Sequence, residues 1–456
     1  MMNRRIGLGA LLSAGFLLAA CASTAPAPPV VPIAWTQFGL GESPELIARV
    51  LIGPGDECPS ISVDGVATTM VARVSPRAAV FGRMCENRMS LETSRKVRIS
   101  IRNAVLLEQE INRKPERIAV LGDTGCRLTH YFDQGCNSRR TWPFEPIANA
   151  AADKKPELVL HLGDYYYREA PCKRSATDCV PGPYGDREES WRAEFLEPGR
   201  RLLAAAPWVF VRGNHEDCER GGYGWTYYFG DSAQACEIVH ATTHIRLAGL
   251  DLLNVDSAHT DDKHATQEVN DKWAALARKL RENPPTQPVM MLTHEPAYAV
   301  CAKPCDAGDT ANVGGLRAIG DALRASGQRT ILVAGHIHAF QAFDTVPVTL
   351  GGNRGVTQVI VGNGGADLAK FAPPPDPSRQ VTAMFEDLRL ENTGGKKWQS
   401  VRKGQSVARA HTWNEHGFGI LTPTAGLELV MYDVQGQRKV GCQLAAELPA
   451  GAQRCR

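Results

Sequence analysis

The sequence predicts an α/β fold preceded by a small β-rich region. Five short apolar segments have the character of buried parallel strands, and each ends in Asp, Asn or His. Stretches with apolar residues at helical spacing lie between several of these segments, as expected for helices that cover a sheet. The N-terminal part instead has alternating or β-branched segments. With 456 residues, 43% of them hydrophobic, the chain can bury large cores.

The first 20 residues have the features of an export signal. Residues 3–5 are a basic start, and the apolar segment 6–20 that follows is too short for a stable transmembrane span. The motif LAAC at residues 18–21 resembles a bacterial lipobox, which implies cleavage before Cys21 and acylation of that cysteine. An ordinary secretory signal is the alternative.

The residues after the cleavage position predict where the protein resides. Ala22 favours the outer membrane under the sorting rule that the lipobox resemblance implies. The proline-rich residues 25–32 predict a stiff tether within residues 21–34. We therefore expect an exported bacterial lipoprotein that faces the periplasm or the cell surface. The formal net charge of +2 gives no reason to expect a nucleic-acid partner, and the oligomeric state stays unknown.

The cysteines support export. Of 13 cysteines, Cys21 is assigned to the lipid anchor, which leaves an even number for disulfides. Sequence alone cannot fix the connectivity, but the cysteines fall in neighbouring pairs: Cys58 with Cys85, Cys126 with Cys136, Cys172 with Cys179, Cys218 with Cys236, Cys301 with Cys305, and Cys442 with Cys455. A zinc site built from the short pairs at 172 and 301 is the alternative.

Residues 35–112 predict a small β-rich domain whose function the sequence does not indicate. The segments Ile61–Val66, Thr69–Val74 and Val97–Ile101 are alternating or β-branched and predict strands. No ligand-like motif occurs in this region.

Residues 113–456 contain the five strand-like segments and their polar ends. The segments are RIAVLGD ending at Asp123, PELVLHLGDYYY with Asp164 and Tyr167, PWVFVRGNH with Asn214 and His215, PVMMLTH ending at His294, and TILVAGHIH with His336 and His338. Ligands of open α/β sheets bind at the carboxyl ends of the strands. A single strand-end Asp or His is usually a turn or core residue, but this recurrence predicts a metal site.

The rest of this region predicts helices, an insertion and closing strands. Apolar residues at helical spacing predict helices over Phe144–Asp153, Glu188–Ala205, Asn270–Asn283 and Leu316–Ser326. Two polar or proline-rich tracts, Pro373–Pro377 and Glu391–Gln405, predict an insertion or flexible lobe, most simply a solvated loop. Leu427–Tyr432 and Val440–Leu444 predict closing strands.

The order of these motifs resembles the purple acid phosphatases, a branch of the calcineurin-like metallophosphoesterases. The matching blocks are GDTG at 122–125, GDYYY at 163–167, GNHE at 213–216, MLTH at 291–294 and GHIH at 335–338. Tyr167 and the GDxG form of the first block point to the purple acid branch. The resemblance covers residues 117–418, with GNGGA at 362–366 and HGF at 416–418 as weaker matches. It implies a four-layer α/β/β/α sandwich, often preceded by an N-terminal β domain.

The resemblance also implies two metal ions and their ligands. Asp164 would bridge the two ions, with Asp123, Tyr167 and His338 completing one site and Asn214, His294 and His336 completing the other. A carboxylate and a phenolate suit Fe(III), whereas the second set suits a divalent ion such as Zn, Mn or Fe(II). His215 is expected to donate a proton or hydrogen bond to the phosphoryl oxygen or the leaving group.

One departure from the family pattern concerns substrate positioning. The family commonly has a further histidine after the second or fourth block, but residues 168–214 and 295–335 contain none. Residues that offer suitable polar groups instead are His130, Arg168, His259, Tyr298 and Lys303.

The sequence thus predicts a hydrolase of phosphoric esters. The leading hypothesis is an extracytoplasmic acid phosphatase that acts on phosphomonoesters by metal-bound hydroxide attack. A phosphodiesterase or a nucleotide or phospholipid-headgroup hydrolase is the alternative of the same chemistry. A non-enzymatic lipoprotein with a structural metal site is the third, and His215 beside a complete ligand set argues against it.

Overall fold

The computed structural model describes residues 30–41, 45–74, 77, 80–173, 177–231, 235–259, 267–296, 319–323, 325–343, 357–369, 380–382, 409–423, 427–444 and 455. Cys21, the predicted signal segment, and the predicted insertion at 373–377 and 391–405 lie outside these residues. Among the described helices, none combines the length and the apolar character that a membrane span requires.

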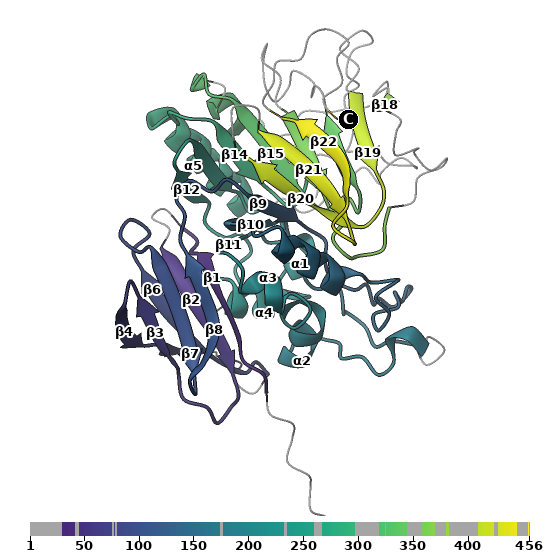
Figure 1. Ribbon diagram of the computed structural model, residues 1–456. Coiled ribbons are helices and arrows are strands. Elements are labelled where there is room, and N and C mark those ends of the chain that lie inside the picture. Colours follow the sequence, from purple (N-terminus) through teal and green to yellow (C-terminus); the bar gives the residue numbers. More distant parts are fainter. Residues whose placement is uncertain are drawn as a thin grey trace, which may run out of the picture.

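Two large mixed sheets lie at the centre of the molecule (Figure 1). The first has the strand order β22-β21-β20-β9-β10-β11-β1-β2-β6-β5, and the second β12-β13-β14-β15-β17-β16-β19-β18. The first sheet consists of β1 Ile33–Phe38, β2 Leu46–Ile52, β5 Val71–Arg73, β6 Arg83–Met89, β9 Ile118–Leu121, β10 Leu158–His161, β11 Trp208–Phe210, β20 Gly417–Thr422, β21 Glu428–Asp433 and β22 Arg438–Gln443. The second consists of β12 Thr243–Leu247, β13 Leu250–Asn254, β14 Val289–Leu292, β15 Thr330–Ala334, β16 Phe340–Phe343, β17 Thr357–Val361, β18 Gln380–Thr382 and β19 Arg409–Trp413.

Alternation along the central strands explains why the two sheets stack. In β9, Ile118 and Val120 belong to the core between the sheets, whereas Ala119 and Leu121 belong to the core beneath the helices. Each central strand is thus buried on both faces, as the continuous apolar segments require. The predicted four-layer α/β/β/α sandwich is confirmed.

Helices cover the outer face of each sheet (Figure 1). On the first sheet lie α1 Phe144–Asp153, α2 Glu188–Trp191, a π-helical turn Arg192–Leu196, α3 Arg200–Leu203 and α4 Gly222–Tyr228, and on the second lie α5 Gln267–Glu282 and helical residues 319–323. The helices predicted from 144 and 270 are confirmed. The prediction of one helix over Glu188–Ala205 is wrong, because Pro198 offers no main-chain N–H and the helix is interrupted before α3.

The N-terminal region is β-rich as predicted, and half of its strands extend the first sheet. Strand β1 pairs in parallel with β11 and antiparallel with β2, which places Ile33 and Ala34, expected in the tether, inside a strand. The strands β3 Ser60–Val63, β4 Val66–Thr69, β7 Lys96–Ile101 and β8 Ala104–Glu110 form a separate sheet. Its core also includes residues of β2, such as Leu46 and Val50, so it packs against the first sheet.

A tight turn corrects one strand prediction in this region. The segment Ile61–Val66 is not one strand, because Asp64 and Gly65 have φ of 50° and 88° and reverse the chain between β3 and β4. Two consecutive positive φ values are characteristic of a two-residue hairpin. Strand β4 is exposed at all 4 positions.

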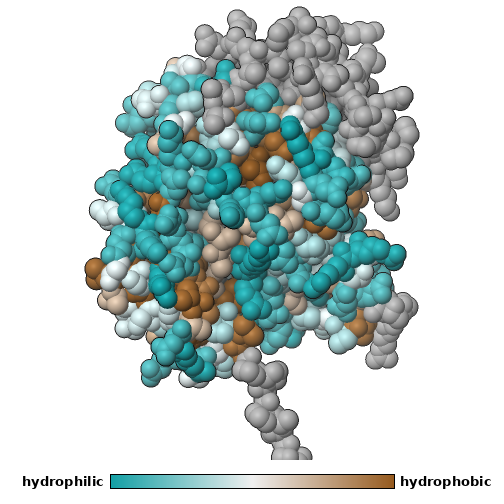
Figure 2. Space-filling view, in the orientation of Figure 1, coloured by the Kyte–Doolittle hydropathy of each residue, from teal (hydrophilic) through white to brown (hydrophobic). Residues whose placement is uncertain are grey.

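The face in Figure 2 is largely hydrophilic, with hydrophobic residues gathered in separate patches.

Disulfides form as the neighbouring cysteines predict. The structure contains Cys58–Cys85, Cys126–Cys136, Cys172–Cys179, Cys218–Cys236 and Cys442–Cys455. The sixth predicted pair, Cys301 with Cys305, lies outside the described residues. Since Cys172 is bonded to Cys179, this pair has no free thiolate for the alternative zinc site.

Candidate active site

The predicted ligands meet at one edge shared by the two sheets. Asp123, Asp164 and Asn214 follow β9, β10 and β11 of the first sheet. His294 follows β14 and the pair His336 and His338 follows β15 of the second sheet. Asp123, Asp164, Tyr167 and His294 are buried, while Asn214 and the other two histidines are partly exposed. The site therefore has a buried floor that opens towards solvent.

Three of these residues have a left-handed backbone conformation, which residues other than glycine rarely adopt. The φ angles of Asp123, Asp164 and His336 are 55°, 57° and 70°. Such a conformation costs about 1–3 kcal/mol per residue and occurs preferentially at functional sites. Hydrogen bonds across the site hold it in place, since Asp123 N–H donates to Gly163 O at 2.9 Å and His336 N–H to Asp123 Oδ2 at 2.9 Å.

The first half of the cluster surrounds Tyr167. Its hydroxyl donates to Asp164 Oδ2 at 2.6 Å and lies 2.9 Å from His338 Nε2. Asp123 Oδ1 lies 3.6 Å from the same His338 nitrogen. The four side chains assigned to the first metal thus converge on one point.

The second half surrounds His294. Its Nε2 lies 2.9 Å from Asn214 Oδ1, 3.2 Å from Asp164 Oδ2 and 3.3 Å from His336 Nδ1. Two groups of side chains have ligand atoms close enough together to hold a metal ion, and Asp164 belongs to both. One group contains His294 and His336, and the other contains Asp123 and His338. This position is the one that a bridging carboxylate requires.

The histidines are oriented to offer lone pairs to the cluster. Nδ1 of His294 lies 2.7 Å from Leu162 O, and Nδ1 of His338 lies 2.6 Å from Asp367 O. When Nδ1 donates to a carbonyl, Nε2 carries a lone pair, as in metal-bound histidines. His294 Nε2 and Asn214 Oδ1 are then two acceptors that face each other, and a cation between them would resolve the contact. The residues present therefore fit a metal.

The electrostatics of the floor also fit bound cations. Burial and the charge of Asp164 raise the pKa of Asp123 well above its usual value. Burial also acts to raise the pKa of Asp164, but His294, His215 and the Tyr167 hydrogen bond lower it well below its usual value. Burial and both carboxylates raise the pKa of Tyr167. Cations would balance the two buried carboxylates and favour the phenolate.

His215 lies beside the cluster and has a carboxylate partner that the sequence analysis did not identify. Its Nδ1 is 2.5 Å from Glu169 Oε1, and its main-chain N–H donates to Asp164 Oδ1 at 3.1 Å. Its ring lies 4.1 Å from the Tyr167 ring. Because Glu169 pairs with Nδ1, Nε2 is the ring nitrogen that could serve the role predicted for His215.

Glu216 is a second residue that the sequence analysis missed, although it belongs to the GNHE block. Its buried carboxylate accepts the main-chain N–H groups of Asp164, Tyr165, Tyr166 and Gly213 at 2.9–3.0 Å. It therefore ties the loop after β10 to the loop after β11. Gly213 has no room for a side chain, since a Cβ would lie 2.1 Å from Asp164 Oδ1.

Glu194 supports the loops from the helical layer. Its Oε1 accepts the main-chain N–H of Cys126 at 2.6 Å and of Tyr167 at 2.9 Å. Burial raises the pKa of Glu194 to about 8. Its Oε2 is 3.7 Å from Arg168 Nε, so Arg168, a candidate for substrate positioning, is a buried partner of this carboxylate.

The two weak motifs have a packing role. A Cβ on Gly362 of the GNGGA motif would lie 2.1 Å from Ile337 O and 2.9 Å from Asp123 Oδ2. Gly417 of the HGF motif donates its N–H to Asn363 O at 3.0 Å. Both motifs thus let main-chain segments approach the ligand loops closely.

Of the other candidates for substrate positioning, the structure describes His130 and His259. His130 is exposed and His259 is partly buried. Tyr298 and Lys303 lie outside the described residues.

Comparison with known proteins agrees with this geometry. Residues 116–340 match the family model described as calcineurin-like phosphoesterase. The chain carries a calcineurin-like metallophosphoesterase domain. The protein is thus a metal-dependent phosphoester hydrolase, and the domain implies two metal ions. The assignment of individual side chains to each ion stays a prediction.

Two solved structures resemble this metallophosphoesterase. Purple acid phosphatase PPD1 from yellow lupin (Lupinus luteus) seeds is 15% identical, with a TM-score of 0.55 over 90% of this chain and 73% of that one. The structure of PhoD is 11% identical, with a TM-score of 0.48 over 94% of this chain and 95% of that one. No curated protein sequence matches the chain. The lupin enzyme shows a shared fold.

Proposed function

We propose that the protein is an extracytoplasmic acid phosphatase that hydrolyses phosphomonoesters. The observation that carries the proposal is the pair His215 and Glu169, 2.5 Å apart, beside the cluster of predicted metal ligands. A histidine held by a carboxylate through Nδ1 can donate a proton from Nε2 to a departing alkoxide. A purely structural metal site has no need of such a pair.

The chain's own residues divide the work. Asp164, Asp123, Tyr167 and His338 would hold one cation, and Asp164, Asn214, His294 and His336 the other. When bound, such a metal pair activates water and polarises the phosphoryl group. His215 Nε2 gives its proton to the leaving oxygen, and Glu169 keeps the ring aligned and stabilises the charged imidazole. Asp164 Oδ1 accepts the His215 main-chain N–H, and this hydrogen bond fixes the position of His215 relative to Asp164.

Two observations support the proposed preference for phosphomonoesters: Tyr167 in the GDxxY block, and the fold shared with a purple acid phosphatase. A panel of alkyl and aryl phosphates, with matched diesters, tests this preference on the metal-loaded protein at pH 5 to 7. We expect kcat/KM for monoesters to exceed that for diesters. The opposite order would move the protein to the phosphodiesterases and leave the hydrolytic chemistry in place.

The proposed metal pair is Fe(III) with Zn, Mn or Fe(II). A buried phenol beside two carboxylates is a hard donor set of the kind that a trivalent ion prefers. Charge transfer from Tyr167 would colour the protein, and Tyr167→Phe should abolish the band while the fold persists. A colourless, active wild-type protein that contains only zinc or manganese would reject Fe(III).

The proposed location is a bacterial membrane, through acylation of Cys21. Two or more acyl chains, at about 0.8 kcal/mol per buried methylene, suffice for stable anchoring. The native protein should fractionate with membranes, and Cys21→Ala should release it or leave it unprocessed. Recovery of the native protein entirely in the soluble periplasmic fraction would contradict the anchor.

A further inference from the structure

Arg220 contacts both groups that set the position of His215. Its Nη2 donates to the main-chain carbonyl of Asn214, which belongs to the peptide bond that joins Asn214 to His215. Its Nη1 lies 3.6 Å from Glu169 Oε1, the oxygen that pairs with His215 Nδ1. One guanidinium therefore contacts the main chain next to the donor and the carboxylate that orients its ring.

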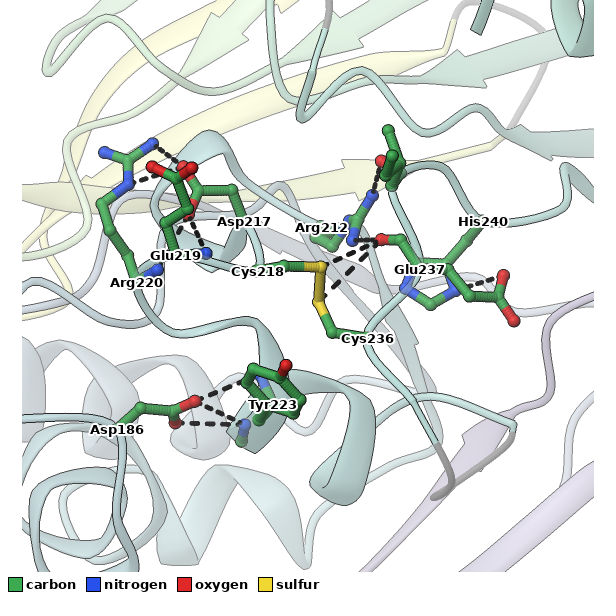
Figure 3. The surroundings of a disulfide bond; sticks show 12 residues. Asp186, Arg212, Asp217, Cys218, Glu219, Arg220, Tyr223, Cys236, Glu237 and His240 are labelled. Atoms are coloured by element: carbon green, nitrogen blue, oxygen red, sulfur yellow. Dashed lines mark hydrogen bonds and ion pairs between the residues drawn. A yellow bond between two sulfur atoms is a disulfide. The ribbon is translucent and has the colours of Figure 1, made fainter. Parts of the chain in front are cut away.

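Arg220 is itself held firmly. Its Nε and Nη2 lie 2.8 and 2.7 Å from Asp217 Oδ2. Asp217 Oδ1 accepts the main-chain N–H groups of Glu219 and Arg220, each at 2.9 Å. Cys218, within the same turn, is bonded to Cys236 (Figure 3). The turn from Asp217 to Arg220 is thus fixed by an ion pair and a disulfide, so the guanidinium has little freedom to move.

The guanidinium of Arg220 and the carboxylate of Glu169 also face the same cavity. A cavity of about 330 Å³ is lined by Arg220 and Glu169 together with Tyr166 and Tyr223. Arg220 therefore lies where it can keep Glu169 Oε1 directed at His215.

We propose that Arg220 is a positioning residue for the proton donor His215. It attracts Glu169 Oε1 and holds the Asn214–His215 peptide, so that Nε2 of the ring points to the leaving oxygen. The inference rests on the proposed function, because it assigns Arg220 to the proton transfer that His215 performs. Arg220 needs no contact with substrate or metal in this role.

A double-mutant cycle with two substrates tests the role. Arg220→Met, Arg220→Lys, His215→Ala and the double variant His215→Ala/Arg220→Met are assayed as metal-loaded proteins. The substrates are an alkyl phosphate, whose leaving group needs a proton, and a dinitrophenyl phosphate, whose leaving group does not. Arg201→Met is the control, since it removes another arginine–aspartate pair, with Asp153, on the helical layer.

Arg220→Met should lower kcat for the alkyl phosphate by about 10- to 100-fold, the range for residues that orient an active-site group. KM, metal content and turnover of the dinitrophenyl phosphate should stay near wild type, and Arg220→Lys should recover part of the loss. In the His215→Ala background, Arg220→Met should lower kcat for the alkyl phosphate by less than about 2-fold, because the residue that Arg220 positions is absent.

Three outcomes would overturn the inference: an equal loss on both substrates, a loss of metal, or the same fold-loss with and without His215. If the methionine variant fails to fold, Arg220→Lys is compared with wild type on the same two substrates. Lysine keeps the positive charge but loses the simultaneous contact with Glu169 and the Asn214 carbonyl. A His215→Ala variant with unchanged alkyl phosphate turnover would instead reject the proposed function. Failure of the Arg220 role alone leaves the His215 effect intact.

Discussion

The ligand cluster and the proton-donor side of the site are held in place in different ways. Main-chain carbonyls of Leu162 and Asp367 fix His294 and His338, and left-handed backbone at the strand ends aims the carboxylates. His215 instead depends on the side-chain charges of Glu169 and Arg220. The cluster is thus built into the edge of the sheets, whereas the donor depends on a few ion pairs in the loops.

The largest effect should come from Asp164, the predicted bridging ligand. Asp164→Asn removes the one charge that both metal groups share, so metal content should fall and turnover should drop by at least ~10³-fold for all esters. The fold should persist, because the amide keeps the shape and relieves repulsion with Asp123. Metal analysis and steady-state kinetics check this expectation. A variant that keeps both metals would show that Asp164 is not the bridge.

The matched change on the donor side should have a smaller and more selective effect. Glu169→Gln, also a carboxylate-to-amide change, should leave both metals bound and lower kcat by about 10- to 100-fold for poor leaving groups only. The reason is that the amide no longer stabilises the charged His215 ring. Kinetics on the alkyl and dinitrophenyl phosphates measure the selectivity. Loss of metal in this variant would erase the distinction between the two regions.

Removal of the Cys218–Cys236 disulfide should loosen the loops around His215 and leave the cluster of predicted metal ligands unchanged. Cys218→Ser/Cys236→Ser opens a link of sequence separation 18 and should cost about 2–4 kcal/mol of stability. Because Cys218 lies in the turn that holds Arg220, kcat for alkyl phosphates should also fall several-fold. The control is Cys442→Ser/Cys455→Ser, of sequence separation 13, which should lose stability and keep its kcat. Equal activity of the two variants would contradict the link between this turn and His215.

The smallest effect concerns acid stability near the same disulfide. Burial lowers the pKa of His240 to about 3, and its main-chain N–H donates to Asp256, the partner of Arg212. The unfolded chain takes up a proton near pH 6.5 and the folded chain does not, so His240 destabilises the fold as pH falls below about 6.5. His240→Gln should flatten this loss by up to about 1.4 kcal/mol per pH unit.

Thermal or urea unfolding between pH 4 and 7 measures this slope. The exposed His130→Gln variant is the control and should keep the wild-type pH dependence. An unchanged slope in His240→Gln would show that other groups set the acid stability of this region.

Local patterns in the sequence predicted most of the fold and the polar residues at the strand ends, whereas the assignment of these residues to two metal ions came from the family resemblance. Most of the predicted ligands lie within a few residues of the end of an apolar strand, so local burial and a short turn place them near the sheet edge. The three adjacent tyrosines show the limit of such patterns. Tyr165 and Tyr166 donate their hydroxyls to the main-chain carbonyls of Val211 and Arg168, and only Tyr167 reaches the cluster.

Patterns of residues close along the chain were enough to predict the polar ends of the central strands, α1 and the five neighbouring-cysteine disulfides that the structure describes. The charged residues that support these elements become apparent only from contacts between distant parts of the chain. Glu194 reaches Cys126 across 68 residues, and β1 joins the first sheet through Gln37 and Trp208. Isolated charged residues such as Glu169, Glu216 and Arg220 have no periodicity. Their roles arise only when folding brings distant loops together and buries these charges fully, as for Glu216, or partly, as for Glu169 and Arg220.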